Sequence, residues 1–176
     1  MRWFFALLPL VLWSCDETSP KGDSPEPGEP TKPQVQEASG QSWRTFSQDD
    51  WEEIAFGGEG AARWKDGVLE LDAGVELTGV RFVGKELPAL PYELELEARK
   101  MMGNDFFCGL TFPVSSPEEC LTLVVGGWGG GTVGISSIDD LDASENETTT
   151  YGNFEKEQWY AVRLVVEEGR LRAFLD

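Results

Sequence analysis

The chain contains no histidine and few basic residues. The missing histidine excludes Ser-His-Asp and Cys-His nucleophilic sites and any His-ligated zinc site. The 176 residues include 14 Lys and Arg against 32 Asp and Glu, a formal charge of -18, and such acidity repels nucleic-acid phosphates. We therefore expect no nucleic-acid partner. Any metal would be held by oxygen ligands, with calcium the best suited, and any general acid or base would be a carboxylate.

The apolar run at the N-terminus is too short to cross a bilayer as a helix. It covers Trp3 to Trp13 after a positive Met1-Arg2 start, and it fits the apolar region of a secretory signal peptide. It ends in Leu-Trp-Ser-Cys15, which resembles a bacterial lipobox, although Trp13 stands where a small residue is usual. We expect a lipoprotein signal peptide over residues 1–14 and lipidation of Cys15. An ordinary signal peptide followed by an unpaired cysteine is the alternative.

The segment 16–41 has no aromatic residue, and Val35 is its one branched aliphatic. Pro, Glu, Ser and Gly dominate it, so it cannot bury enough apolar area to fold. We expect residues 15–41 to comprise the lipidated cysteine and a disordered acidic tether, which lifts a domain over residues 42–176 off the membrane. The protein would lie in the bacterial cell envelope, on the inner or outer membrane, facing the periplasm or the exterior.

Only two cysteines follow Cys15. They are Cys108 and Cys120, twelve residues apart, and in an oxidising envelope such a pair suggests a disulfide across a hairpin. A loop of this size would add roughly 3 kcal/mol in the chain-entropy picture. Two buried free thiols are the alternative, because the sequence does not fix the register of the strands.

No long stretch after Trp43 shows a helical period. In Tyr92–Arg99, Tyr, Leu, Leu and Ala occupy one face and three Glu and an Arg the other, as in a half-buried antiparallel strand. A short helical turn near Gln48–Ile54, capped by Ser47, is expected as well. Many short strands with frequent turns predict an all-β fold, an antiparallel β-sandwich of the jelly-roll type. Further strands are expected at Ala62–Lys65, Val68–Asp72, Val75–Val83, Phe106–Phe112, Leu121–Val125, Thr132–Ile138, Gln158–Glu167 and Arg170–Leu175.

Several motifs point to a family. They read GNDFFCGLTFPV from Gly103, GGWG from Gly126, SSID from Ser136, WY at Trp159 and GRLRAFLD at the end. Together they resemble concanavalin A-like jelly rolls of planctomycete-type envelope proteins and are similar to the 3-keto-disaccharide hydrolase domain family. The two closing motifs also resemble laminin-G-like domains. The resemblance implies a concanavalin A-like fold, which hosts lectins, hydrolases and interaction modules.

In such domains at least one more strand follows the position of Asp176. Either the sequence is truncated, or the sandwich lacks its last edge strand. An incomplete sheet would expose a pairing edge, so we favour truncation.

Paired carboxylates form the first candidate site. Glu93, Glu95 and Glu97 share one face of the expected strand, and neighbours on that face are roughly 6.6 Å apart. Retaining glycosidases use carboxylates about 5 Å apart, and laminarinase-type enzymes, which share the jelly-roll fold, carry a similar E-x-D-x-E strand. The alternative is a solvated strand face with Arg99 as a partial counter-charge.

The acidic segment 136–147 forms the second candidate site. Asp140, Asp142 and Ser144 have the one-three-five spacing of a calcium loop, but Glu145 and Tyr151 replace the glycine and the bidentate acid of an EF-hand. An irregular calcium site therefore remains open as the one cofactor we consider. The alternatives are a loop ordered by side-chain to backbone hydrogen bonds or a loop that contacts ligand.

The glycine-rich stretch VVGGWGGGTVG, residues 124–134, forms the third candidate site. It matches the G-x-G-x-x-G pattern, but a phosphate loop needs a helix after it, and Thr132–Ile138 is strand-like. We interpret the glycines as a place where two strands meet and bend. Trp128 either presents its ring to a sugar or lies in the core. The expected ligand-binding residues are Trp128, Asp139, Asp142, Glu145 and Asn146.

Two functions follow from these sites. We expect a membrane-tethered module, more plausibly not an enzyme, that binds carbohydrate or another envelope component. The alternative is a glycan-modifying hydrolase, related to 3-keto-disaccharide hydrolases or β-glucanases, that uses carboxylates. Its candidate acids are Glu93, Glu95, Glu97, Asp139 and Asp142.

Overall fold

The computed structural model describes residues 2–6, 43–87 and 89–176. Cys15 and the expected tether lie outside these residues, as does most of the expected signal peptide. Among the residues described, no helix has both the length and the apolar character needed to span a bilayer.

The described residues form twelve strands and one short 3-10 helix, η1. All paired strands are antiparallel. The elements in chain order are β1 (Arg2–Ala6), η1 (Gln48–Asp50), β2 (Trp51–Glu53), β3 (Ala62–Lys65), β4 (Val68–Asp72), β5 (Val80–Phe82), β6 (Tyr92–Lys100), β7 (Cys108–Pro113), β8 (Cys120–Gly127), β9 (Thr132–Ser136), β10 (Thr150–Tyr151), β11 (Trp159–Glu167) and β12 (Arg170–Leu175).

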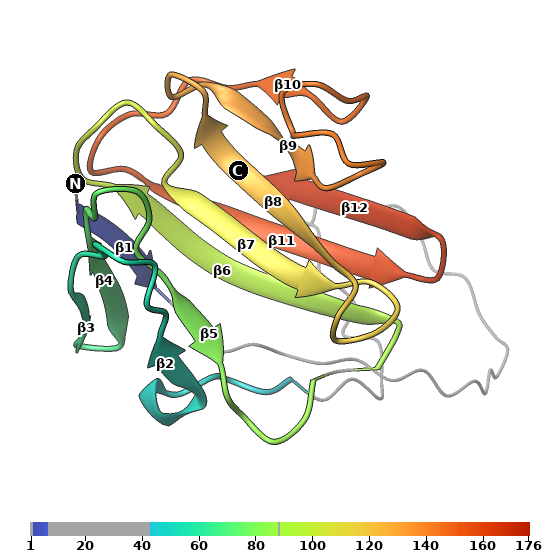
Figure 1. Cartoon of the computed structure of the whole chain (residues 1–176), viewed down its shortest axis with the longest axis horizontal. Helices are drawn as coiled ribbons and strands as arrows, with labels where there is room; N and C mark the ends of the chain where they lie inside the picture. Colours follow the sequence, from blue (N-terminus) through green and yellow to red (C-terminus); the bar gives the residue numbers. More distant parts are fainter. Residues whose placement is uncertain (1, 7–42, 88) are drawn as a thin grey trace, which may run out of the picture.

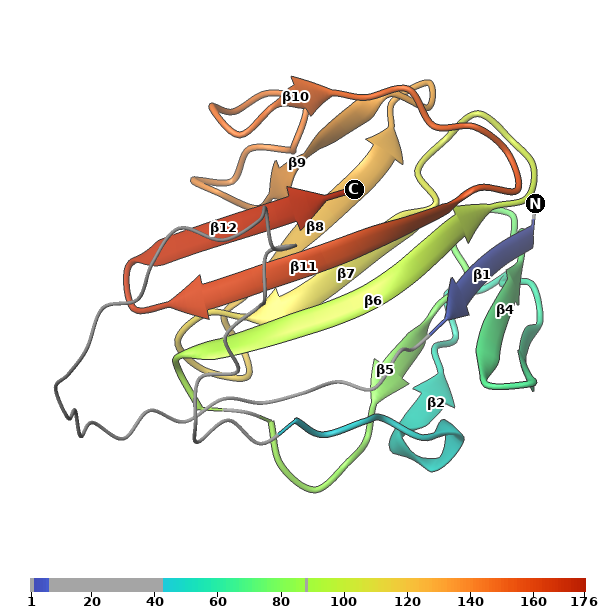
Figure 2. The same cartoon turned by 180° about the vertical axis from the view of Figure 1, so that it is seen from behind.

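The strands build an antiparallel β-sandwich, which confirms the all-β sandwich predicted from the sequence, while its jelly-roll topology stays a prediction (Figure 1). The larger sheet has the order β12-β11-β6-β1-β4-β3, and the smaller sheet has the order β10-β9-β8-β7. Figure 2 shows the larger sheet from behind, with β6 and β1 at its centre and β11 beside β6. A separate two-stranded sheet pairs β2 with β5.

The core lies between the two sheets. Apolar and polar residues alternate along β6 and β11, and the pairing of the two strands brings their apolar residues onto the same face. Tyr160 lies opposite Ala98, and Leu164 lies opposite Leu94, so one face of this strand pair is apolar. Phe107, which precedes β7, packs against this face through Tyr160, with ring centroids 5.6 Å apart. The apolar area removed from water along this face is the main driving force for the fold. The opposite face of β6 carries its glutamates.

The register of the β7–β8 hairpin does not allow the expected disulfide. Cys108 lies opposite Val125, whereas Cys120 lies opposite Pro113, five residues further along β7. Five residues of strand span about 17 Å, and a disulfide needs Cα atoms within about 7 Å of each other. Both cysteines are free thiols, so the predicted disulfide is wrong. Cys108 is fully buried, and burial raises the pKa of its thiol to about 12.

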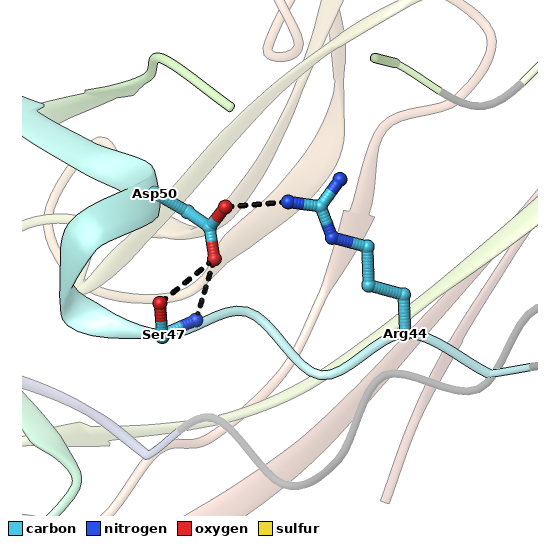
Figure 3. Close-up of polar contacts among 3 residues, drawn as sticks. All are labelled: Arg44, Ser47 and Asp50. Carbon is cyan, nitrogen blue, oxygen red and sulfur yellow. Dashed lines mark hydrogen bonds and ion pairs between the residues drawn. The ribbon is translucent and has the colours of Figure 1, made fainter. Parts of the chain in front are cut away.

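A clasp of side chains holds the start of the domain, and Figure 3 shows its polar contacts among Arg44, Ser47 and Asp50. Asp50, at the end of η1, accepts hydrogen bonds at Oδ2 from the Ser47 backbone N–H, at 2.8 Å, and from the Ser47 hydroxyl, at 3.0 Å. Its Oδ1 pairs with the Arg44 guanidinium at 2.5 Å. That guanidinium lies 5.4 Å from the ring centroids of both Phe46 and Phe82. The expected helical turn is therefore present but short, and the chain continues from it directly as β2.

Residues of the expected signal peptide form a strand of the larger sheet. β1 pairs with β4 on one side and with β6 on the other (Figure 2). This position inside the sheet was not predicted from the sequence, because pairing between distant segments leaves no local signal.

Candidate ligand-binding site

The glycine-rich stretch forms the hairpin between β8 and β9 (Figure 1). The ladder between the two strands shifts register between Val125 and Gly127, so Gly126 forms a bulge. Gly126 has φ +77°, and a Cβ on it would lie 2.9 Å from the Phe107 ring. The interpretation that two strands meet and bend here is confirmed, since a strand rather than a helix follows the glycines.

Other positions in this stretch are occupied by glycine because neighbouring segments pack directly against the backbone there. A Cβ on Gly130 would lie 3.3 Å from the Asn104 carbonyl oxygen, and one on Gly134 would lie 2.7 Å from the Ala143 carbonyl oxygen. Asn104 lies 26 residues before Gly130 in the chain, whereas Ala143 lies nine residues after Gly134. Close packing therefore explains why glycine occupies these positions, without any bound phosphate.

Trp128 lies at the tip of this hairpin, and half of its surface is exposed. The Gly130 N–H donates to the Gly127 carbonyl oxygen at 3.1 Å, which closes a four-residue turn. Trp128 and Gly129 are its central residues, with φ +43° and +94°, as in a type I′ turn. No heavy atom lies within 4 Å of the position that a Cβ would take on Gly129. Trp128 is thus not a core residue, and the space beside its turn is open.

The turn lies between two polar segments at one end of the smaller sheet. Asn104 and Asp105, on the segment that leads into β7, are exposed, and Asn104 is the neighbour of Gly130 described above. On the other side, the Gly152 N–H donates to the Gly131 carbonyl oxygen at 2.8 Å. This bond brings the end of β10 beside the hairpin. The turn at Trp128 therefore has exposed polar residues on one side and the end of β10 on the other.

The acidic segment lies at the other end of β9. Asn146 donates through Nδ2 to the carbonyl oxygens of Ile135, at 2.8 Å, and Asp142, at 2.9 Å. Its Oδ1 accepts from the backbone N–H and the hydroxyl of Thr148 at 3.0 and 2.6 Å. Ile135 is three residues beyond Thr132 along β9, or about 10 Å. The expected ligand set is therefore divided, with Trp128 at one end of β9 and Asn146 at the other.

Two of the expected loop residues fill a second tight turn. The Leu141 N–H donates to the Ile138 carbonyl oxygen at 2.9 Å, and Asp139 and Asp140 between them have φ +50° and +63°. Aspartate is among the residues that this turn type favours. Their identity is explained by backbone conformation without any bound ion.

The described residues show no cluster of ligands for the calcium ion that the sequence left open. In the described ranges, no three His, Cys, Asp or Glu side chains gather as they would around a metal ion. Asn146 organises the loop through hydrogen bonds to the backbone, as in the alternative that the sequence left open. Ser144 and Glu145 lie in the same loop and are half-buried and exposed respectively. Metal binding by Ser144 and ligand binding by Glu145 stay predictions.

The three strand glutamates lie on the outer face of β6, each half-buried. Glu95 is opposite Arg163 in the ladder, and the Arg163 guanidinium approaches Glu93 at 3.5 Å. Glu95 and Glu97 also line a hollow of about 300 Å³, together with Arg163, Phe174 and Asp176. The strand register thus brings the expected carboxylates together on one face, as predicted.

A second hollow, about 310 Å³ in volume, was not anticipated from the sequence. It opens at the edge where β10 faces β12, and its lining is largely apolar. Tyr151, which is 80% exposed, belongs to it. Little in the sequence indicates this hollow, because β10 is only two residues long. The lining also includes Val133, Asn153, Phe154, Tyr160 and Leu175.

Compared with family models, curated proteins and solved structures, the chain matches none of them.

Proposed function

We propose that the protein is an envelope-tethered module that binds carbohydrate through Trp128. The observation that carries this proposal is the combination of exposure and strain at this residue, which is 50% exposed and has φ +43°. A bulky side chain at positive φ is uncommon, and such a conformation costs on the order of 1–3 kcal/mol. Backbone strain of this kind gathers at functional sites.

Comparison within the chain sharpens the point. Three other segments have consecutive residues at positive φ, Gly57-Gly58, Asp66-Gly67 and Asp139-Asp140. Each begins with glycine or aspartate, which this conformation accepts, as it accepts asparagine. The hairpin at Trp128 departs from this rule. Since folding alone would favour Asn-Gly there, the indole is better explained by a contact with a ligand.

The chemistry of the surroundings suits a neutral sugar. An exposed indole offers a flat apolar face with a polar N–H at its edge, against which the C–H groups of a pyranose ring can pack. Asn104 lies beside the turn and is exposed, so its side chain is available to sugar hydroxyls. The next residue, Asp105, already accepts a hydrogen bond at Oδ1 from the Phe106 N–H, at 2.8 Å. The net charge of -18 disfavours strongly anionic ligands.

A glycan array probed with the processed protein tests this proposal. We expect binding to a restricted set of neutral glycans, lost in Trp128→Asn and kept in Tyr151→Asn, a control that removes another exposed aromatic. Equal signals for wild type and Trp128→Asn would contradict the proposal. Binding to an envelope protein but to no glycan would replace carbohydrate by a protein ligand.

A carboxylate-dependent hydrolase is the second candidate, favoured by the hollow beside β6. Glu95 and Glu97 both line it, next to the Arg163 guanidinium and the exposed Phe174 ring. This function predicts turnover of a keto-disaccharide or β-glucan that Glu95→Gln or Glu97→Gln abolishes. Thr111→Ala, on an exposed position of the other sheet, would be the control.

A further inference from the structure

The larger sheet contains a slot for one strand between β4 and β6. β1 fills it, running antiparallel to both neighbours. Two strands that flank a third are about 9.6 Å apart, too far for direct hydrogen bonds. Without residues 2–6, the facing edges of β4 and β6 would therefore carry unpaired backbone groups inside the sheet.

The register shows what the slot requires of its occupant. The position of Phe5 lies between Leu69 and Ala98, and that of Trp3 lies between Leu71 and Lys100. Leu69, Leu71 and Ala98 are buried, with exposures of 4%, 4% and 0%. A strand in the slot must therefore present apolar residues at two positions, with one residue between them.

The intervening position has a different character. Phe4 occupies it, opposite Glu70 on β4 and Arg99 on β6. Glu70, at this position, and Lys100, which lies opposite Trp3 on the other face of the sheet, are buried with exposures of 8% and 6%. Lys and Glu are seldom found so deeply buried. When water enters the slot, strands that carry them lose less free energy than purely apolar strands would. The slot is therefore suited to being vacated and refilled.

Residues 2–6 belong to the segment that the sequence predicts to be removed before Cys15. We infer that the slot between β4 and β6 of the processed protein is a strand-binding site, and that its occupant is an extended apolar segment of another envelope polypeptide. The added strand runs antiparallel to both walls, as β1 does. Main-chain hydrogen bonds supply affinity in such strand addition, and alternate side chains supply specificity.

Two nearer sources of a strand are poor fits. The predicted tether 16–41 has no aromatic residue and Val35 as its one branched aliphatic, so it lacks the apolar alternation. A second processed copy has lost the same N-terminal segment. The inference rests on removal of residues 1–14 and is independent of carbohydrate binding at Trp128, which lies in the other sheet.

Hydrogen exchange on the processed protein, purified from membranes in detergent, tests the inference. Its intact mass first establishes cleavage before Cys15. We expect the amides of Val68–Asp72 and Glu97–Lys100 that point into the slot to exchange at least about tenfold faster than those in the β7–β8 ladder, while the amides paired with β3 and β11 stay protected. A peptide of residues 2–6 with a lysine added at each end should slow the slot-facing amides of both segments by at least about tenfold.

Two altered peptides separate backbone pairing from side-chain burial. A Phe4→Pro peptide loses a ladder N–H, and a peptide with both Trp3→Ser and Phe5→Ser loses the two apolar positions. Each should protect both segments at least about tenfold more weakly than the parent peptide. Equal protection by all three peptides would overturn the inference.

Three further outcomes would also overturn it. Retention of residues 1–14 would leave β1 in the slot. Protection of the slot-facing amides in the monomer without peptide would mean that the same chain closes the slot. Protection that rises with protein concentration, together with a dimer in size-exclusion chromatography, would make a second copy the occupant.

Discussion

Cys108 and Cys120 lie at opposite ends of the β7–β8 ladder, five rungs apart, although a pairing through the hairpin was expected. Cys108 is buried in the core, whereas Cys120 is partly exposed and its thiol donates to the Pro117 carbonyl oxygen at 3.4 Å. The two thiols therefore differ in access, and burial also raises the pKa of the Cys108 thiol to about 12.

This difference predicts selective alkylation. With iodoacetamide at pH 8, the native protein should be modified at Cys120 and not at Cys108, because the thiolate is the reactive form and Cys108 is both buried and protonated. Mass spectrometry of peptides cleaved after glutamate measures the result, because Glu118 and Glu119 lie between the two cysteines. In denaturant, without reductant, both should react. Failure of either to react in denaturant until reductant is added would restore the disulfide.

The bulge at Gly126 predicts a large effect of one methyl group. Gly126→Ala forces a Cβ to within 2.9 Å of the Phe107 ring at φ +77°, so we expect a loss of about 2–4 kcal/mol in the free energy of unfolding. Gly129→Ala is the matched control, with φ +94° and open space around it. It should lose only about 1–2 kcal/mol, from backbone strain. Urea denaturation measures both, and equal losses would argue against the Phe107 contact.

The loop after β9 should depend on Asn146 rather than on an ion. Asn146→Ala removes four hydrogen bonds, and we expect a loss of about 2–4 kcal/mol at roughly 1 kcal/mol net for each bond. Glu145→Ala, at the exposed neighbouring position, should change stability by less than about 0.5 kcal/mol. A rise in Tm with added calcium that is lost in Asp140→Asn would instead support a metal site.

The clasp at the start of the domain predicts a pH dependence. Hydrogen bonds from Ser47, chiefly from its backbone N–H, and the nearby Arg44 charge lower the pKa of Asp50 below its ordinary 3.8. The ionised carboxylate therefore stabilises the fold fully above about pH 4, and this contribution is lost as the pH falls through the lowered pKa. Asp50→Asn should lower Tm at pH 7 and have little effect near pH 2. The exposed neighbour Asp49→Asn should change Tm little at either pH, and an Asp50→Asn difference that is constant with pH would contradict the clasp.

Alternation of apolar and polar residues predicted the strands well wherever both faces of a strand are distinct. The bounds of β3, β4 and β12 agree with the expected ranges. The expected strand Val75–Val83 is real only over Val80–Phe82. Its first part instead forms a turn, in which a Cβ on Gly74 would lie 2.7 Å from the Leu77 carbonyl oxygen.

Features that depend on contacts between distant segments could not be predicted. The cysteine pairing required the β7–β8 register, which side-chain alternation does not fix along a two-stranded hairpin. The glycines at 126 and 134 required knowledge of Phe107 and Ala143, which pack against them. The exposure of Trp128 also depended on the turn type, which follows from backbone conformation at Trp128 and Gly129 together.

The most direct test of the central claim measures ligand affinity and stability together in Trp128→Asn. Asparagine followed by glycine suits the type I′ turn, so the variant should be more stable than wild type by about 0.5–2 kcal/mol. Titration calorimetry with the best glycan from the array should show binding weakened at least about a hundredfold. Unchanged affinity, or a loss of stability alongside a loss of binding, would contradict the account of Trp128 as a strained platform for ligand.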